Sequence, residues 1–218
     1  MNKNICILCL CLTSAICCTS AQDKTSNFDV RHLIHCYYSV CDRGTFATKK
    51  SYFEAFPSTF VDFKNVFGYQ ENPTGETYGE LYKESLSYIV EFFYLNECIP
   101  LSDFSDKVIH MCIDGKWQAD GVNYLKANVV NIVTSTKMAN DCYYYLDIFP
   151  CYNDMVREVF LSRLILLSDD DVLSFWKFYL DGAEVNPIDD ILYQQTLESI
   201  QQFPKLIDLL GEAYNRAE

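Results

Sequence analysis

The chain has little positive charge: 17 Lys and Arg residues stand against 30 Asp and Glu residues, for a net charge of -13. Proteins that bind nucleic acid or dock on anionic lipid by charge need cations to meet the phosphates. The composition therefore argues against a nucleic-acid partner and against electrostatic docking on a membrane. The sequence also lacks a recognisable catalytic motif or cofactor cradle, so we predict no cofactor.

Glycine and proline are also scarce, with 8 and 6 residues among 218, while 50% of the residues are hydrophobic. This composition excludes collagen-like and disordered classes. A chain of this length can bury a core without relying on disulfides. We expect one folded domain that covers residues 22–218.

Long apolar runs are absent after the N-terminus, so we predict no membrane span, which takes roughly 20 apolar residues. Residues 1–21 have the layout of a secretory signal peptide. Lys3 precedes an apolar run from Ile5 to Ile16, and the cleavage site follows Ala21. We therefore predict an exported mature chain in the periplasm or outside the cell. Lipid attachment at Cys17 or Cys18 is a weaker interpretation, because Gly, Ala or Ser usually precedes a lipid-modified cysteine.

Six cysteines remain after the predicted cleavage, and an even number in an exported chain indicates disulfides. The simplest expectation is three local pairs, namely Cys36–Cys41, Cys98–Cys112 and Cys142–Cys151. The alternative is that several of them are buried free thiols, which pack as small apolar residues.

Apolar residues recur at steps of three and four along most of the mature chain, which predicts helices. We expect an all-α fold of about nine or ten short helices, arranged as an antiparallel bundle or as a HEAT-like array of helix pairs. The expected helices include the ranges 28–41, 60–67, 79–96, 102–113, 117–133, 136–149, 154–167 and 169–180. Residues 71–75 are the clearest loop. Thr59, Asp154 and Ser168 are expected to cap helices, and Pro204 divides the C-terminal region into two helices.

Two clusters invite a chemical interpretation. His32, His35, Cys36 and Cys41 are residue types that bind zinc, but export favours disulfides over thiolates, so we predict no metal site. The stretch from Asp114 to Gly121 contains Trp117, two carboxylates and two glycines. One hypothesis is a hydrolase that uses Asp114 and Asp120 as paired carboxylates. The favoured hypothesis is a structural corner between helices, with Trp117 exposed as an interface anchor.

The charge is uneven, with a net charge of -9 in residues 136–218 and -5 in residues 22–135. We therefore predict that the acidic second half carries the main partner surface, because acidic faces attract cationic partners. The candidate residues are Asp169, Asp170, Asp171, Asp189 and Asp190, beside the aromatic residues Trp176 and Tyr193, which we expect to be partly exposed.

Three stretches resemble exported helical proteins of Gram-negative bacteria that are similar in size and style to periplasmic immunity proteins. They are Phe56-Pro-Ser-Thr-Phe60, Gly115-Lys-Trp-Gln-Ala-Asp-Gly121 and Phe175-Trp-Lys-Phe-Tyr179. The resemblance implies no catalytic residues. Together with export and acidity, it favours a non-enzymatic protein that binds and neutralises a protein partner. A secreted helical hydrolase and a structural helical scaffold are the alternatives.

Overall fold

The computed structural model describes residues 28–72, 75–118, 120–134, 148–181 and 188–215. These residues form ten α-helices, two short 3-10 helices and one hairpin of two strands, so the predicted all-α class is confirmed. The α-helices are α1 (Val30–Arg43), α2 (Phe46–Ala55), α3 (Phe60–Phe67), α4 (Ser85–Tyr94), α5 (Leu101–Cys112), α6 (Gly121–Thr134), α7 (Asp154–Leu164), α8 (Asp169–Leu180), α9 (Ile188–Ser199) and α10 (Pro204–Asn215). None of the helices in this described part is long and apolar enough to cross a membrane.

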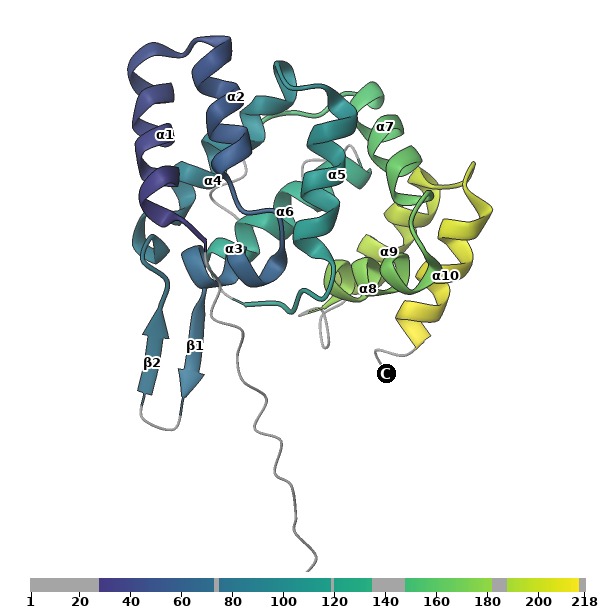
Figure 1. Cartoon of the computed structure of the whole chain (residues 1–218). Coiled ribbons are helices and arrows are strands. Elements are labelled where there is room, and N and C mark those ends of the chain that lie inside the picture. The colour runs from purple at the N-terminus through teal and green to yellow at the C-terminus, as the bar shows by residue number, and fades with distance from the viewer. Residues whose placement is uncertain (1–27, 73–74, 119, 135–147, 182–187, 216–218) are drawn as a thin grey trace, which may run out of the picture.

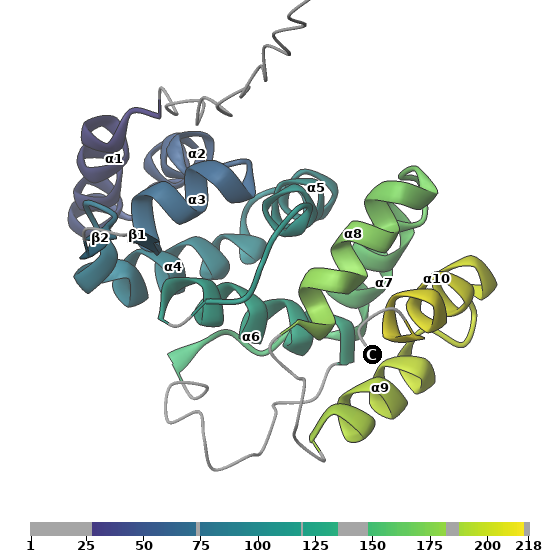
Figure 2. The ribbon, with the colours of Figure 1, turned by 90° about the horizontal axis from the view of Figure 1, so that it is seen from below.

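Helix α6 is the centre of the molecule. It packs against α3, α4, α7, α8 and α9, and its residues from Ala127 to Thr134 are all buried. Around it, α1 packs on α2, α5 on α7 and α8 on α10 (Figures 1 and 2). A helix whose C-terminal half is buried on all sides needs neighbours on all sides, and this arrangement supplies them.

Short polar side chains begin several helices as the sequence indicated. Thr59 Oγ1 accepts a hydrogen bond from the Asp62 amide at the start of α3, and Ser168 Oγ accepts one from the Asp171 amide at the start of α8. The cap of α7 differs from the expected one. Asn153, rather than Asp154, accepts the bond from the amide of the third helical residue, and Asp154 is the first helical residue.

Three lysines bind the carbonyl ends of helices from other parts of the chain. Lys107 donates to carbonyls in the last turn of α2, Lys126 to the carbonyl that ends α8, and Lys205 to the Leu167 carbonyl after α7, at 3.0 Å. Cations at these positions complement the negative end of the helix dipole. Burial lowers the pKa of Lys107 to about 8. The few basic residues of this acidic chain thus join helices that are distant in sequence.

The sequence-based interpretation misses the hairpin. Residues 71–75 were expected as a loop, but Glu71 and Asn72 end β1 (Tyr69–Asn72) and Gly75 begins β2 (Gly75–Tyr78), whose antiparallel register pairs Tyr69 with Tyr78. Each strand has four residues, which is too short for apolar alternation to reveal. The hairpin projects from the helical body (Figure 1).

Two expected helices are shorter than their apolar patterns. The range 79–96 contains the 3-10 helix η1 (Tyr82–Glu84), then α4, then the 3-10 helix η2 (Leu95–Glu97). The range 117–133 becomes helical only from Gly121. The expected helix 136–149 lies almost wholly outside the described residues.

The pair Cys36–Cys41 does not form in the structure. Helix α1 continues to Arg43, so residues five apart lie about 140° apart around the helix. Cys36 accordingly faces the core, whereas Cys41 is exposed.

The pair Cys98–Cys112 is also absent, and both thiols are free. Cys98 precedes α5 and Cys112 ends it, and this helix of 12 residues is about 18 Å long. A disulfide requires Cα atoms within about 7 Å. Cys142 lies outside the described residues, so the pair Cys142–Cys151 stays a prediction, with Cys151 exposed.

Candidate binding groove

A groove of about 820 Å³ lies between α3, the start of α1, the start of β1 and the corner that joins α5 to α6. Its apolar lining includes Phe60 and Val66, which belong to the core, and Val61 and Trp117, whose side chains are 55% and 45% exposed. This volume is within the usual range of ligand sites, about 300–1,000 Å³. The groove is therefore large enough for a short segment of another protein.

The corner that carries Trp117 is attached to α8 by hydrogen bonds. The Asp114 amide donates to Ser174 Oγ at 2.8 Å, and Ser174 Oγ donates to Asp114 Oδ1 at 3.1 Å. The Trp117 amide donates to Asp181 Oδ2 at 2.8 Å, at the end of α8. The backbone on both sides of the corner is thus held in place, while the indole is left half-exposed.

Two glycines allow the corner to approach its neighbours closely. A Cβ atom at Gly115 would lie 2.5 Å from Cδ2 of Phe178, and one at Gly121 would lie 2.7 Å from the Phe67 carbonyl oxygen. Both distances are shorter than van der Waals contact. Any larger residue would therefore force a shift between the corner and α8 or α3.

Charges of both signs surround the groove. Lys64 and Lys116 contribute two cations, and Glu80 and Asp114 contribute two carboxylates. The groove is therefore nearly neutral in a chain whose net charge is -13. The strongest recognition that it offers is apolar contact with Trp117 and Val61, since burial of large apolar side chains dominates interface energies.

Asp120 ends the corner and binds to the base of the hairpin. Its carboxylate accepts a hydrogen bond from the Tyr82 hydroxyl, which raises the pKa of Tyr82 to about 12. The Tyr82 ring also packs on Tyr78, with ring centroids 4.7 Å apart. Asp114 binds Ser174 and lines the groove, whereas Asp120 binds Tyr82. The two carboxylates of the hydrolase hypothesis thus contact different neighbours.

The predicted acidic surface begins at the other end of α8. Asp169 Oδ1 lies 2.8 Å from Lys205 Nζ, and Asp171 Oδ2 accepts a hydrogen bond from Ser168 Oγ at 2.7 Å. Asp170 is exposed. Because α8 has 12 residues, these acids lie about 18 Å along the helix axis from the end that holds Trp117. The acidic turn and the groove are therefore separate surfaces.

Trp176 corrects a sequence-based expectation, because its side chain is 0% exposed. Its ring packs edge-on against Phe175 and Tyr179, with centroids 5.1 and 5.2 Å apart. It cannot contact a partner directly. Neighbouring helices cover both faces of α8, which the apolar pattern of α8 alone did not reveal.

The other predicted partner residues lie in α9. Tyr193 is partly buried and packs against Tyr214 of α10, with ring centroids 4.4 Å apart. Asp189 and Asp190 belong to the first turn of α9, but their side chains lie outside the described part of the structure. The structure does not bring Trp117 together with these residues into one described site.

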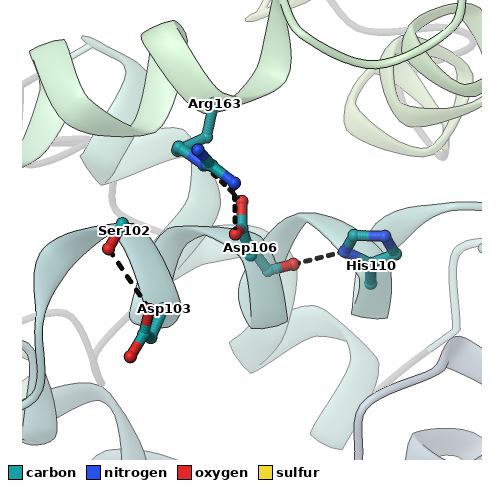
Figure 3. Close-up of polar contacts among 5 residues, drawn as sticks. All are labelled: Ser102, Asp103, Asp106, His110 and Arg163. Carbon is teal, nitrogen blue, oxygen red and sulfur yellow. Dashed lines mark hydrogen bonds and ion pairs between the residues drawn. The ribbon is translucent and has the colours of Figure 1, made fainter.

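A polar cluster joins α5 to α7 (Figure 3). Arg163 donates two hydrogen bonds to the Asp106 carboxylate, at 2.7 and 2.6 Å. His110 Nδ1 lies 2.6 Å from the Asp106 backbone oxygen. The Ser102 hydroxyl donates a hydrogen bond to the Asp103 carboxylate rather than to Asp106. The Asp106 carboxylate is thus directed at Arg163 and away from His110, so the cluster has the form of an interhelical clamp.

The His and Cys residues of α1 do not gather into a metal site. Cys36 Sγ lies 3.7 Å from His32 Nε2, and burial, with a smaller contribution from Glu54, raises the pKa of the thiol. His35 and Cys41 are exposed. Within the described residues, no group of three or more His, Cys, Asp or Glu side chains is placed to hold a metal ion.

Sequence reasoning identified Trp117 but missed its neighbours in the groove. Val61 is the clearest omission: it is apolar, yet lies outside the stripe of Phe60, Phe63, Val66 and Phe67 that forms the buried face of α3. The signal in the sequence is an apolar residue that lies outside the buried face of a short helix. Phe28 and Val30 also line the groove, but nothing in their spacing connects them to Trp117.

Comparisons of the chain with protein-family models, with curated proteins and with solved structures found no match.

Proposed function

We propose that this chain is an exported protein that binds a protein partner and neutralises it, in the manner of an immunity protein or an inhibitor. In this proposal, a segment of the partner lies in the groove beside Trp117. The observation that carries the proposal is the combination of a half-exposed indole with a fixed backbone. A side chain that is already positioned loses little conformational freedom on binding, and Trp is among the residues that contribute most at interfaces.

The expected energy of such contact is substantial. Fully burying a large apolar side chain contributes about 1.5–3 kcal/mol. Trp117 and Val61 are about half-exposed, so covering both contributes about 2 kcal/mol before other contacts are counted. Acidic residues elsewhere on the surface raise the rate at which a basic partner arrives. In this proposal, Trp117 and Val61 determine the lifetime of the complex, whereas the acidic residues determine how fast it forms.

Photo-crosslinking tests the position of the partner. A photoreactive phenylalanine analogue is placed at Val61 in the groove or, as a matched control, at Met155 on α7, since these side chains are 55% and 59% exposed. We expect one protein to be crosslinked at Val61 and not at Met155 when the variants are expressed in their native host. Equal crosslinking at both positions, or none at Val61, would contradict the proposal.

Neutralisation is tested with the captured protein. Trp117→Ala is expected to weaken its binding about 30-fold, as for a residue worth about 2 kcal/mol at an interface. Leu166→Ala is the control, because Leu166 is 69% exposed in the turn after α7 and does not line the groove. The captured protein should harm cells that lack this chain and spare cells that contain it. Protection by Trp117→Ala equal to that of the unaltered chain would reject the groove as the neutralising site.

A further inference from the structure

The hydrogen-bond register of the hairpin determines which backbone groups face outward. The Gly79 amide donates to the Gly68 carbonyl, so this opposite pair is hydrogen-bonded. Hydrogen-bonded and non-hydrogen-bonded pairs alternate along an antiparallel ladder. Gln70 and Thr77 are then a bonded pair, whereas Tyr69 with Tyr78 and Glu71 with Glu76 are not. The N–H and C=O groups of Tyr69 and Glu71 therefore point away from β2.

The outer edge of β1 has no strand partner within the described residues, and β1 contributes a residue to the groove. The sheet has only two strands in the described part of the chain, so no third strand covers β1 there. Gln70 of β1 lines the groove, whereas no residue of β2 does. A strand laid along β1 therefore continues toward Trp117 and Val61. An edge with outward N–H and C=O groups is a template for pairing with another chain.

Charge indicates the chemistry of such a strand. Residues 69–80 contain Glu71, Glu76 and Glu80 but no Lys or Arg. Opposite charges on adjacent strands stabilise their pairing, and like charges oppose it. The same argument disfavours pairing with a second copy of this acidic hairpin. The complementary segment is extended, basic, and carries a large apolar side chain where it reaches the groove.

We propose that the open edge of β1 is a strand-addition site, which binds a basic extended segment of the partner and directs its apolar end into the groove. The inference rests on the proposed function, because it specifies the form in which the partner enters the groove. Backbone hydrogen bonds to Tyr69 and Glu71 set the register of the added strand, and Trp117 and Val61 select its apolar residue.

Matched proline substitutions separate the two edges of the hairpin. Glu71→Pro removes an outward N–H from β1, and Glu76→Pro makes the same chemical change at the directly opposite position on β2. Proline is tolerated at edge positions whose N–H faces solvent, so both variants should keep the hairpin. The probe is a phage-displayed library of random dodecapeptides selected on the unaltered chain. We expect enriched peptides to be basic, with apolar residues at every second position.

The enriched peptides should bind Glu71→Pro at least tenfold more weakly, and Glu76→Pro as tightly as the unaltered chain. Equal binding to both proline variants, with weaker binding to Trp117→Ala, would overturn strand addition and leave the groove as the site. Failure to enrich any peptide would also overturn it. The crosslinking at Val61 decides the proposed function separately in every case.

Amide hydrogen exchange of the unaltered chain supplies a second readout that does not depend on a proline variant. When an enriched peptide binds, exchange at Tyr69 and Glu71 should slow at least tenfold, while exchange at Glu76 and Tyr78 stays unchanged. Slowing on the β2 edge instead would contradict the proposal. Two other outcomes would replace the partner as the occupant. If Tyr69 and Glu71 already exchange slowly in the free chain, and this protection is lost when residues 22–27 are removed, the occupant is the chain's own N-terminal segment. If the protection increases with protein concentration, the occupant is a second copy of the chain.

Discussion

The two ends of α8 support very different surfaces. Asp181 at its C-terminal end and Ser174 in its middle hold the corner that presents Trp117 beside a nearly neutral groove with both polar and apolar lining residues. At its N-terminal end, Asp169 and Asp171 are engaged by Lys205 and Ser168. The difference teaches that one helix can begin in an acidic turn whose carboxylates are partly engaged within the chain and hold, nearer its other end, a corner that leaves an indole half-exposed. The acids contribute to the folded state, whereas the exposed indole has no evident structural role of its own.

The largest expected effect compares the two tryptophans. Trp176→Ala should lower the free energy of unfolding by about 3–5 kcal/mol, because it leaves a cavity in a packed core. Trp117→Ala should lower it by less than about 1 kcal/mol, since half of the side chain is already in water. Urea unfolding followed by circular dichroism measures both. Similar losses for the two variants would show that the corner is part of the core.

The close contact between the corner and α8 is tested next. Gly115→Ala places a methyl group against Phe178 and should cost about 1–3 kcal/mol by overpacking. Gly211→Ala in α10 is the control, because the nearest atom to its Cβ would be the Tyr193 hydroxyl oxygen at 3.7 Å. Alanine there should be neutral or stabilise the helix by about 0.5–1 kcal/mol. Thermal unfolding compares the melting temperatures of the two variants, and equal melting temperatures would refute the close contact.

Alkaline pH should affect a buried tyrosine and a partly exposed one differently. Burial raises the pKa of Tyr179 in α8, whereas the hydrogen bond to Asp120 raises that of Tyr82 beside the groove to about 12. A raised pKa stabilises the folded state below the unfolded value of about 10, and this contribution is lost as the pH rises above it. Above pH ~10, the free energy of unfolding should therefore fall less steeply with pH in Tyr179→Phe than in Tyr82→Phe. The check is urea unfolding at a series of alkaline pH values, and equal slopes for both variants would contradict the comparison.

The smallest effect is expected from the exposed acid of the first turn of α8. Asp170→Lys should cost about 0.5 kcal/mol through the helix dipole. It should also slow association with a basic partner a few-fold at low salt, with an unchanged dissociation rate. Trp117→Ala should instead accelerate dissociation. Surface plasmon resonance at two salt concentrations separates the outcomes, and unchanged, salt-independent association of Asp170→Lys would remove the acidic turn from the partner surface.

Much of the fold follows from local signals in the chain. The spacing of apolar residues predicts most described helices, and Thr59 and Ser168 begin α3 and α8 through side-chain bonds that involve only neighbouring residues. Pro204 begins α10, as expected for a residue with no amide hydrogen to donate. These features depend on contacts within a few residues, and the sequence therefore contains them. The hairpin was missed because its strands are too short to show a period.

The sequence alone therefore determined the helical class, several helix boundaries and the acidity of the chain, since each depends on local chemistry or composition. Only the tertiary structure decided which tryptophan is exposed. Trp176 lies on a helix whose other face is also covered by neighbours, whereas Trp117 lies in a corner that leaves its side chain 45% exposed. The groove likewise combines α3, a distant corner and a strand. Periodicity identifies an apolar face, but whether another element covers that face depends on packing between segments far apart in the sequence.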